Sequence, residues 1–207
     1  HAPFVDVGTT TLDNELATLI VQETNGTTIV SESGTTDVVQ VRLSAVPTST
    51  VTVLVSVDDS SETGASVSSL TFTASNWNVP QSVTLTGLDD AIVDGPVLSL
   101  LRFAFAASSP GAYASALPTS VAVTTSDNEI AGLVVVESGG STAVSEAGSS
   151  DTVTVRLTAR PVQNVILTIQ SLDTSEFTVS PVTLTFTPVN WNVPQTVTII
   201  GVDDSIL

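Results

Sequence analysis

The 207-residue chain contains no cysteine and no methionine, so disulfide bonds and thiol chemistry are excluded. Its single histidine is His1, at the N-terminal end. A Ser-His-Asp triad would therefore have no anchored base, and a zinc centre would lack its usual ligands. Aromatic residues make up only 4% of the chain, too few to line the sugar-binding groove that paired glycosidase carboxylates would need. These absences indicate that the protein is not an enzyme.

Lysine is absent too, and four arginines stand against 21 acidic residues, for a formal net charge of −17. Nucleic acid and anionic membrane surfaces are disfavoured as partners, because both require clustered Lys or Arg. No apolar run approaches the roughly 20 residues that span a bilayer, so no direct membrane insertion is expected in this segment. Cations are the natural partners. Adaptation to high salt is a rival explanation, although charged residues total only 12% and gather at turns.

An internal repeat organises the chain. The segment 76–81 (NWNVPQ) reappears as 190–195, a shift of 191 − 77 = 114 residues. The same shift, without a gap, relates Val30-Ser31-Glu32 to Val144-Ser145-Glu146, Val41-Arg42-Leu43 to Val155-Arg156-Leu157, Asp89-Asp90 to Asp203-Asp204, and Asp13-Asn14-Glu15 to Asp127-Asn128-Glu129.

The repeat predicts that the chain has three parts, as expected for a segment of a longer tandem array. Residues 1–14 match the closing strand of a preceding repeat, residues 15–128 form a complete repeat, and residues 129–207 form a second repeat. The second repeat lacks counterparts of roughly residues 94–126, so we expect it to be unstable alone.

Alternating apolar and polar residues predict about seven strands in one repeat. They are expected near residues 19–23, 38–43, 51–57, 70–72, 82–86, 97–107 and 120–125. No window shows helical periodicity with caps. The fold class is therefore all-β: tandem immunoglobulin-like β-sandwich repeats of about 114 residues, the second copy incomplete. Val, Leu, Ile and Ala must fill the core.

Most acidic residues fall at turns, where loops of a sandwich gather at one end. They include Asp58, Asp59, Glu62, Asp89, Asp90, Asp94, Asp127 and Glu129. Carboxylates held that close repel one another, and a hard divalent cation would remove this cost. Ca²⁺, with six to eight oxygen ligands, suits flexible loop carboxylates better than Mg²⁺. A solvated, solubilising cluster is the alternative.

In order and spacing, these motifs resemble the Calx-beta domains of bacterial surface repeats. The resemblance rests on Val30-Ser31-Glu32, Val41-Arg42-Leu43, Leu70-Thr71-Phe72, Asp89-Asp90 with Asp94, and Asp127-Asn128-Glu129. It implies an immunoglobulin-like sandwich with Ca²⁺ at one tip. The implied ligands are Glu32, Asp89, Asp90, Asp94, Asp127 and Glu129, with Glu146, Asp203 and Asp204 in the second repeat. The family's Asp-Tyr segment is missing here, and Asp59 or Glu62 would take its place.

Three smaller features have structural interpretations. Trp77 and Trp191, one per repeat, are expected to pack as anchors at a sheet edge, with sugar stacking as the alternative. Asn25-Gly26 fits a hairpin turn, although with Thr27 it also matches the N-glycosylation sequence. Arg42 and Arg156 lie in the middle of strands and are expected to pair with nearby carboxylates.

These features predict a rigid, Ca²⁺-stabilised spacer in a secreted bacterial surface or filament protein, with a structural or adhesive role. Its partners would be neighbouring repeats or other copies of the chain. The alternative is an adhesin module that recognises a glycan or a surface protein. A third hypothesis is strand addition, in which residues 4–9 of one copy complete the open sandwich of the next.

Overall fold

The computed structural model describes residues 16–203. Their Cα positions form two compact units. The first contains residues 16–30, 34–87 and 98–124, and the second contains residues 31–33, 88–97 and 125–203. Among the described residues, no helix has the length and apolar character needed to cross a membrane. The predicted strand-addition segment, residues 4–9, and the predicted domain 1–14 lie outside the described residues.

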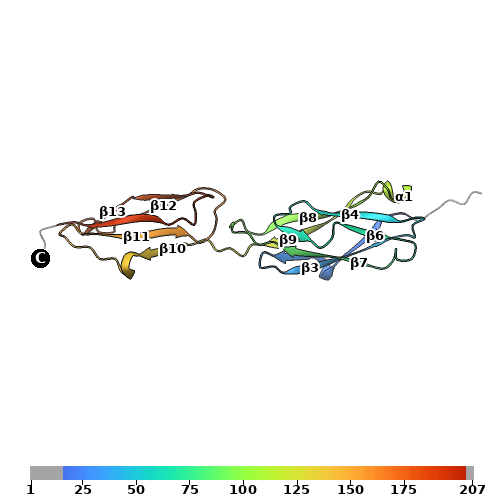
Figure 1. Ribbon diagram of the computed structural model, residues 1–207, viewed down its shortest axis with the longest axis horizontal. Helices are drawn as coiled ribbons and strands as arrows, with labels where there is room; N and C mark the ends of the chain where they lie inside the picture. The colour runs from blue at the N-terminus through green and yellow to red at the C-terminus, as the bar shows by residue number, and fades with distance from the viewer. Residues whose placement is uncertain (1–15, 204–207) are drawn as a thin grey trace, which may run out of the picture. The chain divides into compact units, whose positions relative to one another are not determined.

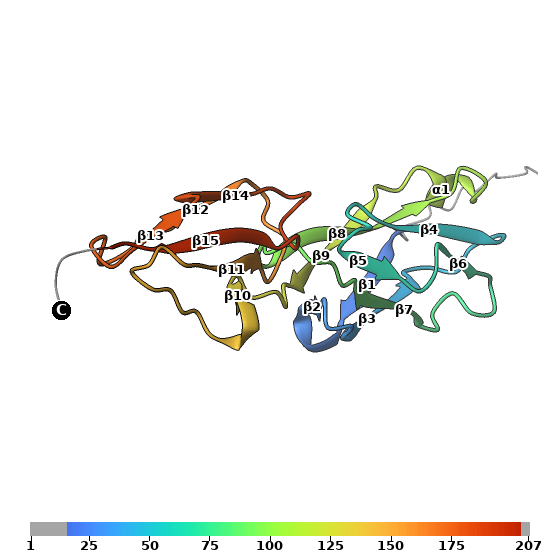
Figure 2. The same cartoon turned by 60° about the vertical axis from the view of Figure 1, so that its left-hand side comes forward.

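The first unit is built from two β-sheets that face each other, as Figures 1 and 2 show. One sheet has the order β1-β3-β7-β5 and the other has the order β2-β9-β8-β4-β6. The strands are β1 (Leu19–Glu23), β2 (Thr28–Ser31), β3 (Thr36–Leu43), β4 (Val51–Val57), β5 (Thr63–Ala65), β6 (Ser69–Phe72), β7 (Gln81–Gly87), β8 (Val97–Phe105) and β9 (Thr119–Ser126).

The core of this unit follows from the period-2 pattern of its strands. In β3, Val39, Val41 and Leu43 are fully buried, and the intervening residues face outward. In β4, Val51 and Val53 are buried in the same way. Phe72 and Phe103 fill the space between the sheets. The predicted immunoglobulin-like β-sandwich is therefore confirmed.

The sequence pattern located seven strands of this unit and missed two short ones. The predicted ranges 19–23 and 51–57 coincide with β1 and β4, and the other five overlap β3, β6, β7, β8 and β9. The pattern missed β2 and β5, which have only four and three residues. It also missed the one-turn helix α1 (Gly111–Ala114), which is too short to show periodicity.

The turn at Asn25 is not the predicted hairpin, because β1 and β2, which flank it, belong to different sheets. The turn is the 3₁₀ element η1 (Thr24–Gly26), in which Asn25 has φ 57° and Gly26 has φ 78°. Asn and Gly adopt this left-handed backbone more readily than other residues, so they suit a sharp change of direction between sheets.

The second unit has a four-stranded sheet in the order β10-β11-β15-β13 and a two-stranded sheet, β12-β14. Its elements are β10 (Leu133–Glu137), η2 (Ser138–Gly140), β11 (Ser150–Leu157), β12 (Val165–Thr168), β13 (Phe177–Ser180), β14 (Thr183–Phe186) and β15 (Gln195–Gly201). Figure 2 shows β12 and β14 as a separate pair. Leu157, Phe186 and Val197 belong to its core cluster, and their counterparts Leu43, Phe72 and Val83 belong to the core of the first unit.

Among the described residues, the two-stranded sheet leaves part of this second core exposed. Val51 in β4 is fully buried, but Val165, its counterpart in β12, is 38% exposed. The reason is that β4 pairs with β8 along one edge, whereas β12 pairs only with β14.

The repeated NWNVPQ segment forms the same turn before β7 and before β15. Asn76 Oδ1 accepts a hydrogen bond from the Thr73 N–H at 2.6 Å, and Asn190 makes the same contact with Thr187. The carbonyl of each tryptophan, Trp77 or Trp191, accepts a backbone bond of 2.9 Å from the strand beside it. Both rings pack against the core clusters. Their predicted role as structural anchors is confirmed.

Candidate metal centre

Three carboxylates from two distant parts of the sequence meet at one end of the sandwich strands. Glu32 follows β2, while Asp127 and Glu129 follow β9, the neighbour of β2 in its sheet. The pairing continues beyond the strands, since the Glu32 N–H donates to the Ser126 carbonyl at 3.1 Å. One carboxylate oxygen from each of the three residues lies within 4.8 Å of the other two. Glu32 is only 2% exposed.

Backbone N–H groups hold the Asp127 carboxylate in place. Its Oδ2 accepts hydrogen bonds from the N–H of Gly95 at 2.7 Å and of Asp94 at 3.0 Å. Its Oδ1 accepts from the Glu129 N–H at 2.7 Å. These bonds, led by the one from Gly95, hold the pKa of Asp127 below its usual value. Asp127 is therefore a fixed negative charge.

Glu129 is the member of the cluster whose ionised form is least favourable. Partial burial, followed by the nearby carboxyl groups of Glu32 and Asp127, raises its pKa from 4.5 to about 7. Its Oε2 atom has no hydrogen-bond partner among the described residues. A buried carboxylate oxygen in this position is costly to leave unpaired, and a cation would satisfy it.

The loop between β7 and β8 brings further acidic groups to the cluster. The pKa of Asp94 is raised by desolvation and then by the charges of Asp127, Asp90 and Glu32. Asp90 Oδ1 accepts the Ile92 N–H at 2.6 Å, which shapes the loop.

Asn128 holds two of the predicted ligands, which the sequence did not indicate. Its backbone N–H donates to Glu32 Oε2 at 3.1 Å, and its side-chain amide donates to Asp89 Oδ1 at 2.9 Å. The only signal in the sequence was the repeated Asp-Asn-Glu triplet.

The remaining predicted ligands lie apart from the three-carboxylate group. Asp59 closes a turn in which its Oδ1 accepts the Ser61 N–H and hydroxyl. Asp173, its counterpart, makes the same contacts with Ser175. This repetition indicates a structural role for Asp59. Glu62 is buried, at 6% exposure, and also lies outside the group.

In the second repeat, Glu146 and Asp203 are both exposed, in contrast to the buried Glu32. Asp204 lies outside the described residues.

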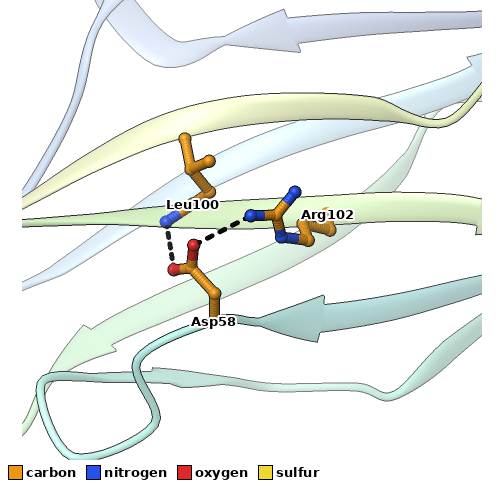
Figure 3. Close-up of polar contacts among 3 residues, drawn as sticks. All are labelled: Asp58, Leu100 and Arg102. Atoms are coloured by element: carbon orange, nitrogen blue, oxygen red, sulfur yellow. Dashed lines mark hydrogen bonds and ion pairs between the residues drawn. The ribbon is translucent and has the colours of Figure 1, made fainter.

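Asp58, another turn acid, is used in an ion pair. Its carboxylate accepts a hydrogen bond from the Leu100 N–H at 2.6 Å and another from Arg102 Nη2 at 3.1 Å. The second contact is also a salt bridge, and both are drawn in Figure 3. Both contacts lower the pKa of Asp58, the Leu100 bond more strongly. Among the described residues the ion pair is Asp58–Arg102, and neither Arg42 nor Arg156 forms one, so the prediction that these two arginines pair with carboxylates was wrong there. Arg156 instead donates to the Leu157 carbonyl at 3.3 Å.

The donor set fits a hard divalent cation. Ca²⁺–oxygen distances are about 2.3–2.6 Å, so two ligand oxygens on one ion lie at most about 5 Å apart. The separation of up to 4.8 Å among Glu32, Asp127 and Glu129 meets this limit. All three donors are carboxylates, which Ca²⁺ prefers to nitrogen or sulfur ligands. Water or further loop oxygens would complete the six to eight ligands.

No protein-family model and no curated protein matches the chain. Solved structures similar to it include the crystal structure of CBD12 from CALX1.2, at 13% identity and TM-score 0.34, covering 90% of this chain and 76% of that one. The crystal structure of the YadV chaperone has 12% identity and TM-score 0.41, covering 87% and 84%. Domains 5–6 of the S-layer protein SbsC have 15% identity and TM-score 0.31, covering 94% and 88%. Similarities this distant carry no functional argument.

Proposed function

We propose that this chain is a structural or adhesive repeat module of an extracellular surface protein, stabilised by Ca²⁺ bound at Glu32, Asp127 and Glu129. The observation that carries the proposal is the close grouping of these carboxylates, one of them 2% exposed and one with a pKa raised to about 7. The resemblance of its motifs to Calx-beta repeats supports the same proposal. The role is non-catalytic.

A bound ion would join three segments that are distant in the sequence. Glu32 lies after β2, Asp127 and Glu129 lie after β9, and the 88–97 loop contacts the cluster through the bonds that Asp94 and Gly95 donate. Without the ion these segments carry mutually repelling charges. With the ion they would be held in one arrangement, which suits a repeat that must stay stiff.

The test is thermal or urea unfolding in EDTA, followed by a Ca²⁺ titration with Mg²⁺ as the comparison ion. Binding to the folded state alone stabilises it by about 2.7 kcal/mol when the free ion reaches 100 times Kd. We expect a Ca²⁺-selective rise in the unfolding midpoint, which Glu32→Gln abolishes.

Glu146→Gln is the matched control, because Glu146 is the exposed counterpart of Glu32. It removes the same charge and should leave the Ca²⁺ response intact. If Ca²⁺ leaves the midpoint unchanged, or if both variants respond alike, the acidic cluster is not a calcium site.

A further inference from the structure

Asn25-Gly26 is the one Asn-Gly pair in the chain, since the other seven asparagines are followed by Glu, Trp or Val. Such a pair has a characteristic reaction. The peptide nitrogen of the glycine attacks the Cγ atom of the asparagine, ammonia leaves, and a five-membered succinimide ring forms. Water then opens the ring at either carbonyl, which gives aspartate or isoaspartate. Glycine favours ring closure because it rotates freely and has no Cβ to hinder the approach.

The turn that carries this pair is open to water. Residues 24–27, which join β1 to β2, are all exposed. No heavy atom of a non-neighbouring residue lies within 4 Å of the place where a Cβ of Gly26 would be. Asn25 has φ 57° and ψ 12°, so its backbone must rotate to bring the next nitrogen onto Cγ. The turn resists this rotation weakly, because the Thr27 N–H reaches the Thr24 carbonyl only at 3.4 Å, beyond the usual distance of about 2.9–3.0 Å.

The side-chain amide of Asn25 makes no hydrogen bond within residues 16–203. Other asparagines of the chain are held in place. Asn76 and Asn190 each accept a hydrogen bond from a backbone N–H of their own turn, and Asn128 donates to Asp89. The Cγ atom of Asn25 is therefore free to turn toward the nitrogen that follows it.

The chain also has one Asp-Gly pair, Asp94-Gly95, which can form the same ring with loss of water. Here the structure opposes the reaction. A peptide nitrogen must lose its proton to attack, and the Gly95 N–H donates at 2.7 Å to the Asp127 carboxylate, whose negative charge holds that proton. No carboxylate accepts the Gly26 N–H in the described part of the chain. The fold thus distinguishes two pairs that the sequence presents alike.

We propose that Asn25 is a site of spontaneous deamidation, at which this protein acquires isoaspartate with time. The reaction consumes only water, and it is irreversible because ammonia is lost. The product adds one negative charge to the turn, and the isoaspartate form adds one atom to the backbone path between β1 and β2. Both changes fall beside Glu23, whose Oε2 accepts the Thr28 hydroxyl at 2.9 Å, so they act on the corner between the two sheets. The inference is independent of the proposed calcium role.

The second repeat provides a natural comparison. Its equivalent turn is η2, and the counterpart of Asn25 is Gly139, since 139 − 114 = 25. Gly139 has φ 65°, close to the φ of 57° at Asn25. The turn therefore keeps its shape without asparagine. The variant Asn25→Gly should remove the reactive side chain and leave the fold unchanged.

Peptide mass spectrometry of the purified chain tests the proposal. The protein is incubated in EDTA at pH 8, folded or in urea, and samples taken over several days are digested. In the folded protein we expect Asn25 to exchange its side-chain nitrogen for oxygen roughly tenfold or more faster than any other asparagine. Isoaspartyl methyltransferase should label the product, because direct hydrolysis of the amide gives aspartate alone. Asn25→Gly should remove this label, and Asp94 should be labelled only in urea.

An Asn25 that stays intact in the folded protein but reacts in urea would overturn the proposal, because the turn would then protect it. Aspartate without isoaspartate would also overturn it, since no ring would have formed. Equal rates at Asn25 and Asn76 would show that the open turn has no effect. Equal labelling of Asp94 and Asn25 in the folded protein would contradict the protection assigned to the Asp127 hydrogen bond.

Discussion

Replacing Glu129 with glutamine should stabilise the metal-free protein, which is unusual for a substitution in a partly buried polar cluster. The side chain lies beside the carboxylates of Glu32 and Asp127, and its ionised form is repelled by both. Glutamine has nearly the same shape, carries no charge, and can donate an N–H to a neighbouring carboxylate. In the presence of Ca²⁺ the same change removes a charged ligand, so its effect should reverse.

The size of the effect follows from the pKa of Glu129, which rises from 4.5 to about 7 on folding. The folded state binds this proton more tightly than the unfolded chain. The associated stability is fully present below pH 4.5 and is lost as the pH rises through about 7. This difference corresponds to about 3 kcal/mol, and screening at a partly exposed carboxylate reduces it to roughly 1–2 kcal/mol.

The assay is urea unfolding in EDTA at pH 4.5 and at pH 8, monitored by circular dichroism. Glu129→Gln should match the wild type at pH 4.5 and exceed its free energy of unfolding by about 1–2 kcal/mol at pH 8. Glu137→Gln is the control, because Glu137 is exposed and its change removes the same amount of net charge. If both variants gain equally at pH 8, relief of the overall charge of −17 explains the result and the local reasoning fails.

Three further predictions concern packing and turns, and urea unfolding checks each. Val51→Ala should cost about 2–3 kcal/mol, whereas Val165→Ala should cost under about 1 kcal/mol, because Val51 is fully buried and Val165 is 38% exposed; equal costs would mean that β12 is covered in solution. Asn76→Ala and Asn190→Ala should each cost about 1 kcal/mol by removing the acceptor of a turn N–H, and a marked difference would contradict their equivalent geometry. Tyr113→Phe should cost about 1 kcal/mol, because its buried hydroxyl donates to the Ala45 carbonyl. An unchanged midpoint would mean that water replaces this bond.

The longer strands could be located from the sequence because their side chains alternate between core and solvent. In β4 the alternation runs over seven residues and depends on little else. The short strands β2 and β5 offer too few residues for a period to show, and they exist because longer neighbours pair with them. The packing role of Trp77 was also predictable, since a rare large side chain repeated at a fixed shift indicates a structural position.

By itself the sequence determined the repeat, the strand pattern and the acidic turns, because these depend on spacing along the chain. Which acids meet was decided by the tertiary structure. Glu32 and Asn128 are 96 residues apart, and sheet pairing brings their ends together. The turn acids Asp58 and Asp59 are instead used by a neighbouring strand and by their own turn. Acidic residues that look alike in the sequence, each in a turn after a strand, therefore have different roles. Their partners come from strands that lie beside them only in the folded protein.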